Sequence, residues 1–149
     1  KFMRPAGDKL FSCGAGLGGG CVDAYGNFQP CMMLRHPDTV YDLKKGTLQD
    51  ALTNFFPKLR EIRATNAEYL ARCSRCFLKG LCEQCPAKSW MEHGALDTPV
   101  EYLCEIAHTQ ARFLGLLEEN ESAWQITNWR PRIEEFAGTA SEQIRSHRN

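Results

Sequence analysis

The sequence predicts a small α+β domain, in which a β-hairpin near the N-terminus is followed by several α-helices, so that the whole is mostly helical. Two observations predict this class. Short extended runs flank a turn at Gly26, and four later segments combine capping residues with apolar residues at helical period. With 149 residues, the chain is long enough for one domain with a modest core.

The hairpin is expected between residues 21 and 31. Its turn is Tyr25-Gly26-Asn27. The flanking residues that we expect in its strands are Val22, Ala24, Phe28 and Gln29. Pro30 places the second strand at a sheet edge or ends it there. The preceding residues 13–20 are too rich in glycine to form a regular element.

Three shorter helices are predicted over residues 47–56, 66–72 and 87–92. The first has Thr47 as its N-cap and Asp50 three residues on, and the second has Asn66 as its N-cap. The third stops at Gly94. The apolar face of the first helix is expected to hold Leu48, Ala51, Leu52 and Phe55.

The clearest helix is predicted over residues 99–119. Thr98-Pro99-Val100-Glu101 combines an N-cap, a proline at the first helical position and a capping box. An apolar stripe follows, made of Leu103, Ile106, Ala107, Phe113, Leu114 and Leu117. We expect residues 1–12 to be a lead-in segment, 13–120 the folded domain, and 121–149 a partly disordered C-terminal extension.

The composition argues against several classes of protein. The formal net charge is zero, which gives no general attraction to nucleic acid or to an anionic membrane. No apolar run approaches the roughly 20 residues of a membrane span, and the start does not resemble a signal peptide. We therefore expect a cytoplasmic protein. The chain begins with Lys1, so a fragment of something longer is also expected.

Eight cysteines are the unusual feature, and four of them fall within residues 73–85, "CSRCFLKGLCEQC". Their spacing is Cys13-x7-Cys21-x9-Cys31, then Cys73-x2-Cys76-x5-Cys82-x2-Cys85, then Cys104. Disulfides or inert buried thiols are alternatives, but clustering without an export signal favours metal. One zinc ion could take the dense run, although five residues between its pairs is short and four thiols would be left over. Two iron–sulfur clusters fit the count better.

The surroundings suit an anionic cluster. Glycines around the cysteines leave backbone amides unshielded, and cationic residues lie beside the dense run. These cations are Arg72, Arg75, Lys79 and Lys88, for which a solvated surface is an equal alternative. His93 and His108 lie near the cysteines, but eight thiols already fill eight positions, so we expect both to be structural.

The pattern Cys13-x12-Gly26-x4-Cys31, followed by the dense run and Cys104, resembles the SPASM domain. This is the C-terminal auxiliary-cluster domain of radical SAM enzymes that mature peptides and proteins. The resemblance covers roughly residues 11–120. It implies two 4Fe–4S clusters, and it assigns the cysteines to them across the dense run. Cluster I would take Cys13, Cys21, Cys31 and Cys85. Cluster II would take Cys73, Cys76, Cys82 and Cys104.

The sequence also departs from the family. Glu83-Gln84 puts two residues between the last cysteines of the dense run, where three are common. Proximity alone would group Cys85 with the rest of the dense run instead, so the partner of Cys85 stays open. Met32 replaces the aspartate that sulfatase-maturating members carry after their third cysteine. No Cys-x3-Cys-x2-Cys motif is present.

Because that motif is absent, we expect no catalytic residue in this chain alone, and S-adenosylmethionine would bind only in a missing catalytic domain. The expected function is an auxiliary domain that relays electrons or positions substrate for a radical SAM oxidoreductase. Its expected partners are that catalytic domain, upstream or separate, a peptide or protein substrate, and an electron donor such as a ferredoxin or flavodoxin. The alternative function is a structural zinc-binding interaction module without a redox role.

Overall fold

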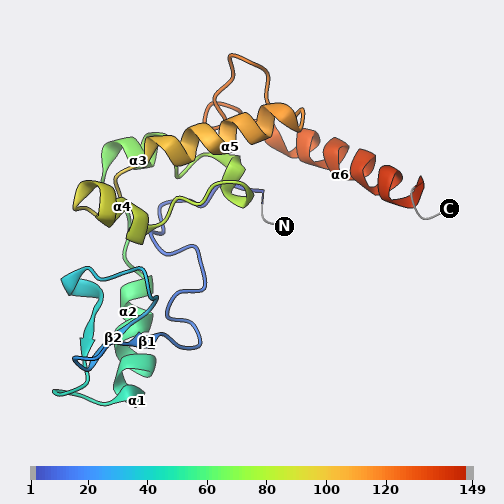
Figure 1. Ribbon diagram of the computed structural model, residues 1–149. Helices are drawn as coiled ribbons and strands as arrows, with labels where there is room; N and C mark the ends of the chain where they lie inside the picture. Colours follow the sequence, from blue (N-terminus) through green and yellow to red (C-terminus); the bar gives the residue numbers. More distant parts are fainter. Residues whose placement is uncertain (1–2, 147–149) are drawn as a thin grey trace.

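The computed structural model describes residues 3–146, and the side chains of residues 3–138 within that range. Figure 1 shows the sheet with α1 and α2 in the lower part of the view, and α3, α4, α5 and α6 in the upper part. A three-stranded antiparallel sheet with order β1-β2-β3 accompanies helices α1 to α6. The predicted α+β class, with a hairpin followed by helices, is confirmed.

The sheet begins with the predicted hairpin. Strand β1 (Cys21–Val22) pairs with β2 (Asn27–Gln29) in antiparallel register, and Gly26 in the turn has φ of 83°. Asp23 Oδ1 accepts hydrogen bonds from the backbone N–H groups of Tyr25 and Asn27 at 2.8 and 3.0 Å, which closes the turn. A third strand, β3 (Tyr41–Asp42), was not expected, because two residues carry no periodic pattern.

The first helical rod runs from α1 (Leu48–Asp50) through a π-helical stretch (Ala51–Phe55) into α2 (Phe56–Arg60). Thr47 Oγ1 accepts from Asp50 N–H at 3.1 Å, so the predicted N-cap is confirmed. The rod continues past residue 56, the predicted end, to Arg60. The wider π turns precede Pro57, whose missing N–H would otherwise interrupt an α-helical ladder.

Helices α3 (Ala67–Ala71) and α4 (Pro86–His93) match their predictions closely. Asn66 Oδ1 accepts from the N–H groups of Glu68 and Tyr69 at 2.9 and 3.1 Å, and Gly94 ends α4 with φ of 67°. Between them, a 3-10 turn (Phe77–Gly80) lies inside the dense cysteine run.

The long helix α5 (Glu101–Phe113) is shorter than the predicted 99–119. Its N-cap is Val100, so the expected Thr98 cap was wrong. The Val100 N–H donates to Gln84 Oε1 at 2.9 Å, and Gln84 lies outside the helix. The apolar stripe was wrong at two positions, since Ile106 is 51% and Phe113 is 90% exposed. The buried face instead carries Leu103, Ala107, His108 and Ala111.

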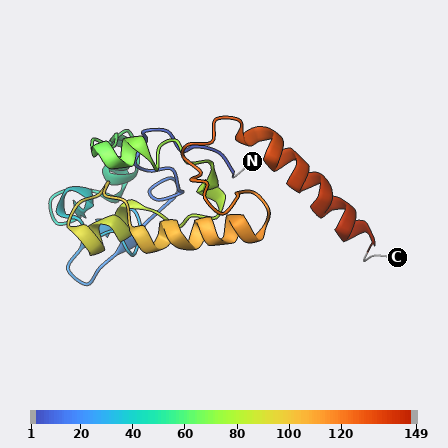
Figure 2. The same ribbon diagram turned by 90° about the horizontal axis from the view of Figure 1, so that it is seen from above.

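Beyond residue 120, the described part of the chain forms one further helix. Helix α6 (Trp129–Ser146) leaves the body and projects away from it in both views (Figures 1 and 2). Trp129, Ile133 and Phe136 pack against a buried core that includes Phe77 and Leu116. This apolar face anchors the first turns of α6. Residues 147–149 lie outside the described residues.

Two apolar cores hold the domain. The first joins the sheet and α2, with Phe28, Leu34 and Phe56 at its centre. The second joins the dense cysteine run, α5 and α6. Ala87 of α4 belongs to the first core.

None of the helices in residues 3–146 combines the length and the apolar content needed to cross a membrane.

Candidate metal centre

Four cysteines from three consecutive turns and one helix line a single cavity. We call them the inner cysteines, and they are Cys73, Cys76, Cys82 and Cys104. Other side chains around the same cavity are Tyr69, Arg72, Lys79, Gln84, His108 and Trp124. These four cysteines are the set that the resemblance assigns to cluster II.

Local hydrogen bonds explain how the dense run gathers three of them. The backbone N–H of Cys76 donates to Arg72 C=O at 3.0 Å, and that of Cys82 donates to Leu78 C=O at 2.9 Å. Phe77 and Leu78, between these turns, are fully buried in the second core. The apolar side chains therefore anchor the run on one side while the thiols face the cavity. Helix α5 supplies Cys104 on its first turn.

The environment disfavours thiolates at these positions unless a cation joins them. Burial, reinforced by the negative charge of Cys82 and Cys104 as thiolates, raises the pKa of Cys73 to about 12. Burial likewise raises the pKa of Cys76 to about 12, and it also raises the pKa of Cys104. As free thiols they are poor nucleophiles. Several soft donors held close together in an apolar cavity match the chemistry of a thiolate-bound metal group, whose positive charge deprotonates its ligands.

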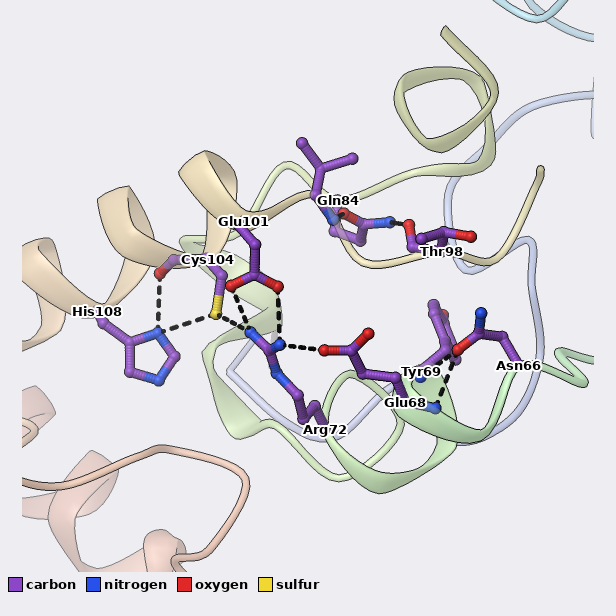
Figure 3. A network of polar contacts seen from close by, with 10 residues as sticks. Asn66, Glu68, Tyr69, Arg72, Gln84, Thr98, Glu101, Cys104 and His108 are labelled. Carbon is purple, nitrogen blue, oxygen red and sulfur yellow. Dashed lines mark hydrogen bonds and ion pairs between the residues drawn. The ribbon is translucent and has the colours of Figure 1, made fainter. Parts of the chain in front are cut away.

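Two N–H donors already point at the sulfurs. Arg72 Nη2 lies 3.5 Å from Cys104 Sγ, and Gln84 N lies 3.4 Å from Cys82 Sγ. Figure 3 shows the Arg72 guanidinium between Cys104 and two carboxylates, Glu101 and Glu68. Hydrogen bonds to sulfur and nearby positive charge stabilise anionic clusters.

His108 lines the cavity and is held by hydrogen bonds at both ring nitrogens. Its Nδ1 lies 2.8 Å from Cys104 C=O, and its Nε2 accepts from Ala123 N–H at 3.1 Å, which fixes the neutral tautomer. Burial lowers its pKa, and the positive charges of Arg112 and Arg72 act in the same direction. The ring also meets Trp124 edge-on at 5.0 Å. His93 is exposed at the end of α4.

The short spacer Glu83-Gln84 separates Cys82 from Cys85. Gln84 is buried, and its amide donates to Thr98 C=O at 3.1 Å and accepts from Val100 N–H at 2.9 Å (Figure 3). Cys82 thus faces the cavity while Cys85, at the start of α4, packs against the first core. Cys31 packs against that same core.

The other four cysteines are Cys13, Cys21, Cys31 and Cys85, which we call the hairpin-side cysteines. Burial raises the pKa of Cys21, and the negative charge of the nearby Cys31 thiolate raises it further. Cys13 is exposed and lines a separate surface pocket with Leu17 and Lys79. Cys21 therefore lies near Cys31, and Cys31 and Cys85 both pack against the first core. Cys13 lines a different pocket from the inner cysteines.

All eight cysteines are free thiols. Within the described residues, no group of three or more His, Cys, Asp or Glu side chains could hold a single metal ion as it stands. A zinc ion holds its thiolates at only about 2.3 Å. A cubane of four irons and four sulfides is larger than one ion and also takes four thiolates.

Sequence reasoning missed the direction in which the cations point. Arg72 has 18% of its side chain exposed and contacts a cysteine, whereas Arg75 is exposed and Lys88 pairs with Glu83. The available signal was position, because Arg72 lies directly between a helix end and Cys73. The buried amide of Gln84 carried no comparable sequence signal.

A comparison of this chain with protein-family models, curated proteins and solved structures finds no match.

Proposed function

We propose that this chain is an auxiliary domain that binds two 4Fe–4S clusters and serves a radical SAM enzyme that matures a peptide or protein. It would relay electrons to or from the catalytic domain, or position the substrate. A ferredoxin or flavodoxin would supply electrons. Free thiols in number suit a reducing compartment, so we place the protein in the cytoplasm.

The observation that carries this proposal is the convergence of the inner cysteines on one cavity. Eighteen residues separate Cys104 from the end of the dense run, yet its thiol lines the same cavity as Cys73, Cys76 and Cys82. Cys85, which sequence proximity would include, packs against the first core instead. This arrangement supports the crossed grouping.

The chain's own residues have defined tasks in this proposal. The inner cysteines hold one cluster, while the Arg72 guanidinium and the Gln84 backbone N–H donate toward its thiolates. Trp124 and Tyr69 form part of the wall that limits water around it. The hairpin-side cysteines hold the second. A bound 4Fe–4S cluster supplies one-electron transfer.

Lys79 lies between the two sites. It lines the inner cavity and also the surface pocket that contains Cys13, and its ammonium donates to Gln84 C=O at 2.9 Å. Lys79 is therefore shared by the walls of the inner cavity and of the pocket that contains Cys13.

The test is metal and sulfide analysis after anaerobic reconstitution. We expect about eight iron and eight sulfide ions per chain, with a brown colour. About four of each would mean that only one cluster forms. Two zinc ions without sulfide and without colour would replace the proposal with the structural zinc module. A Cys-x3-Cys-x2-Cys motif in the upstream reading frame would support the catalytic context.

A further inference from the structure

Arg72 is held more firmly than an ordinary surface arginine. Its Nη1 lies 2.6 Å from Glu68 and 2.7 Å from Glu101, while its Nη2 lies 3.0 Å from the other Glu101 oxygen. The guanidinium carbon lies 4.7 Å from the centre of the Trp124 ring. The two carboxylates and the ring fix the plane of the guanidinium.

Arg72 has two further donor positions beside the cavity, and one of them lies near a sulfur. Nη2 also lies 3.5 Å from Cys104 Sγ. Nε is buried and has no hydrogen-bond partner in the described part of the chain. Buried donors are almost always paired, so an unused one beside a cavity lined by thiols points to an acceptor that belongs there. Sulfide and thiolate sulfur are such acceptors.

We propose that Arg72 donates hydrogen bonds to the sulfurs of the cluster held by the inner cysteines, and that it thereby raises the reduction potential of that cluster above the potential it would have without this residue. This inference rests on the proposed function. Arg72 binds no iron; it acts as a residue that tunes the cluster. We expect no such hydrogen bonds from Arg75, because its side chain is exposed.

The sign follows from charge. Reduction adds one electron to an already anionic group and transfers no proton to or from Arg72. N–H donors and positive charge stabilise the more negative, reduced form. Glu68 and Glu101 together outweigh the single guanidinium charge, so the directed N–H groups, rather than net charge, carry the effect. Without the guanidinium, two carboxylates would remain beside the cluster and disfavour reduction further.

The test is a potentiometric titration with a one-electron reductant, dithionite, followed by electron paramagnetic resonance of the reconstituted protein. In Arg72→Lys, which keeps the charge but loses Nε and the planar fork, one of the two reduction steps should shift. We expect about a tenfold change in its equilibrium toward the oxidised form, about 59 mV for one electron. Arg75→Gln, the matched control, should leave both steps unchanged. An iron-loaded Arg72→Lys with wild-type steps would overturn the inference.

A measurement on the wild type covers the case in which the variant fails to assemble. With arginine labelled by ¹⁵N in the guanidino group, pulsed electron paramagnetic resonance of the reduced protein should detect a ¹⁵N coupling that Arg75→Gln retains. Absence of that coupling in iron-loaded wild type would overturn the inference. Absence of iron in the wild type would instead overturn the proposed function, so the two failures are distinguishable.

Discussion

Around Cys104 the thiols already face one cavity, whereas around Cys13 they are spread between an exposed loop, a strand and the start of a helix. The difference lies in what carries them. The inner cysteines are held by helix α5, which carries Cys104, and by the burial of Phe77 and Leu78 within the dense run. Neither of these needs a bound ligand. The glycine-rich loop has few such anchors. Its main one is Arg60, which donates to the C=O groups of Cys13 and Ala15 at 2.8 and 2.6 Å.

We infer that the fold alone brings the inner cysteines together, whereas the hairpin-side cysteines would come together only when a metal group binds them. The inner cavity gains order from apolar burial and from Gln84, which ties the dense run to the start of α5. On the hairpin side, the hydrogen bond from Gly16 N–H to Pro30 C=O at 3.1 Å is one of the few that fold the loop back on the strands. Metal–thiolate bonds would have to supply the rest of the ordering energy there.

The largest expected effect comes from two double variants that differ in one position. If Cys85 serves the hairpin-side cluster, Cys76→Ser with Cys85→Ser disables both sites and should remove nearly all iron. Cys76→Ser with Cys104→Ser disables one site and should retain about four iron ions. Iron analysis after reconstitution measures both. The reverse ranking would show that Cys85 belongs with the dense run.

Removal of the metal should affect the two regions unequally. After chelation, amides of residues 13–31 should lose hydrogen-exchange protection by roughly tenfold or more, because local opening there is no longer opposed by metal–thiolate bonds. Amides in the middle of α5, such as Ala107 and Ala111, should keep most of theirs. Hydrogen exchange followed by mass spectrometry measures this, and equal losses in both regions would contradict the contrast.

Much of the fold was predictable because short-range chemistry determines it. Thr47, Asn66, Gly26 and Gly94 act where local rules place them. The start of α5 was not predictable, since Gln84, sixteen residues upstream, takes the N–H that a local cap would have taken. The exposed Phe113 misled the periodic pattern for a related reason: helical period identifies a face but not what covers it.

The candidate site divides in the same way. Spacing indicated that the cysteines form a metal-binding set, but their grouping came from the family resemblance and stays a prediction. The inward direction of Arg72 depends on Glu101 and Trp124, which lie 29 and more residues away in sequence. No local pattern separates such an arginine from Arg75, which is solvated.

Gln84→Ala tests how far the inner cavity depends on one buried side chain. The substitution leaves the buried Val100 N–H without its acceptor, so we expect the free energy of unfolding to fall by about 2 kcal/mol. Urea denaturation measures this change. The neighbouring Glu83→Ala, at an exposed position, is the matched control and should have little effect. A neutral Gln84→Ala would mean that the dense run is fixed by apolar burial alone.

On the hairpin side, Gly20→Ala and Gly19→Ala form a matched pair. A Cβ at Gly20 would lie 2.0 Å from Gln29 C=O, so the backbone of β1 must move away from β2. We expect a loss of about 1–3 kcal/mol, as for other overpacked sites. At Gly19 a Cβ meets no heavy atom of the described residues within 4 Å, so thermal unfolding of that variant should change little. Equal effects would show that this loop is not held against the strands.

The smallest effect is expected where α6 joins the second core. Arg132 Nη2 donates to Glu121 Oε1 at 2.8 Å, and this hydrogen bond lowers the pKa of Glu121 to about 2. A carboxylate whose pKa is depressed in the folded state stabilises it fully above the ordinary value near 4.5, and loses that contribution as the pH falls toward 2. The thermal midpoint of the wild type should therefore approach that of Glu121→Gln over this range, and the two should be parallel above it. Because the contact is at the surface, the gap should be small and should shrink further in high salt. A gap that stays constant from neutral pH down to 2 would mean that Glu121 contributes by packing rather than by charge.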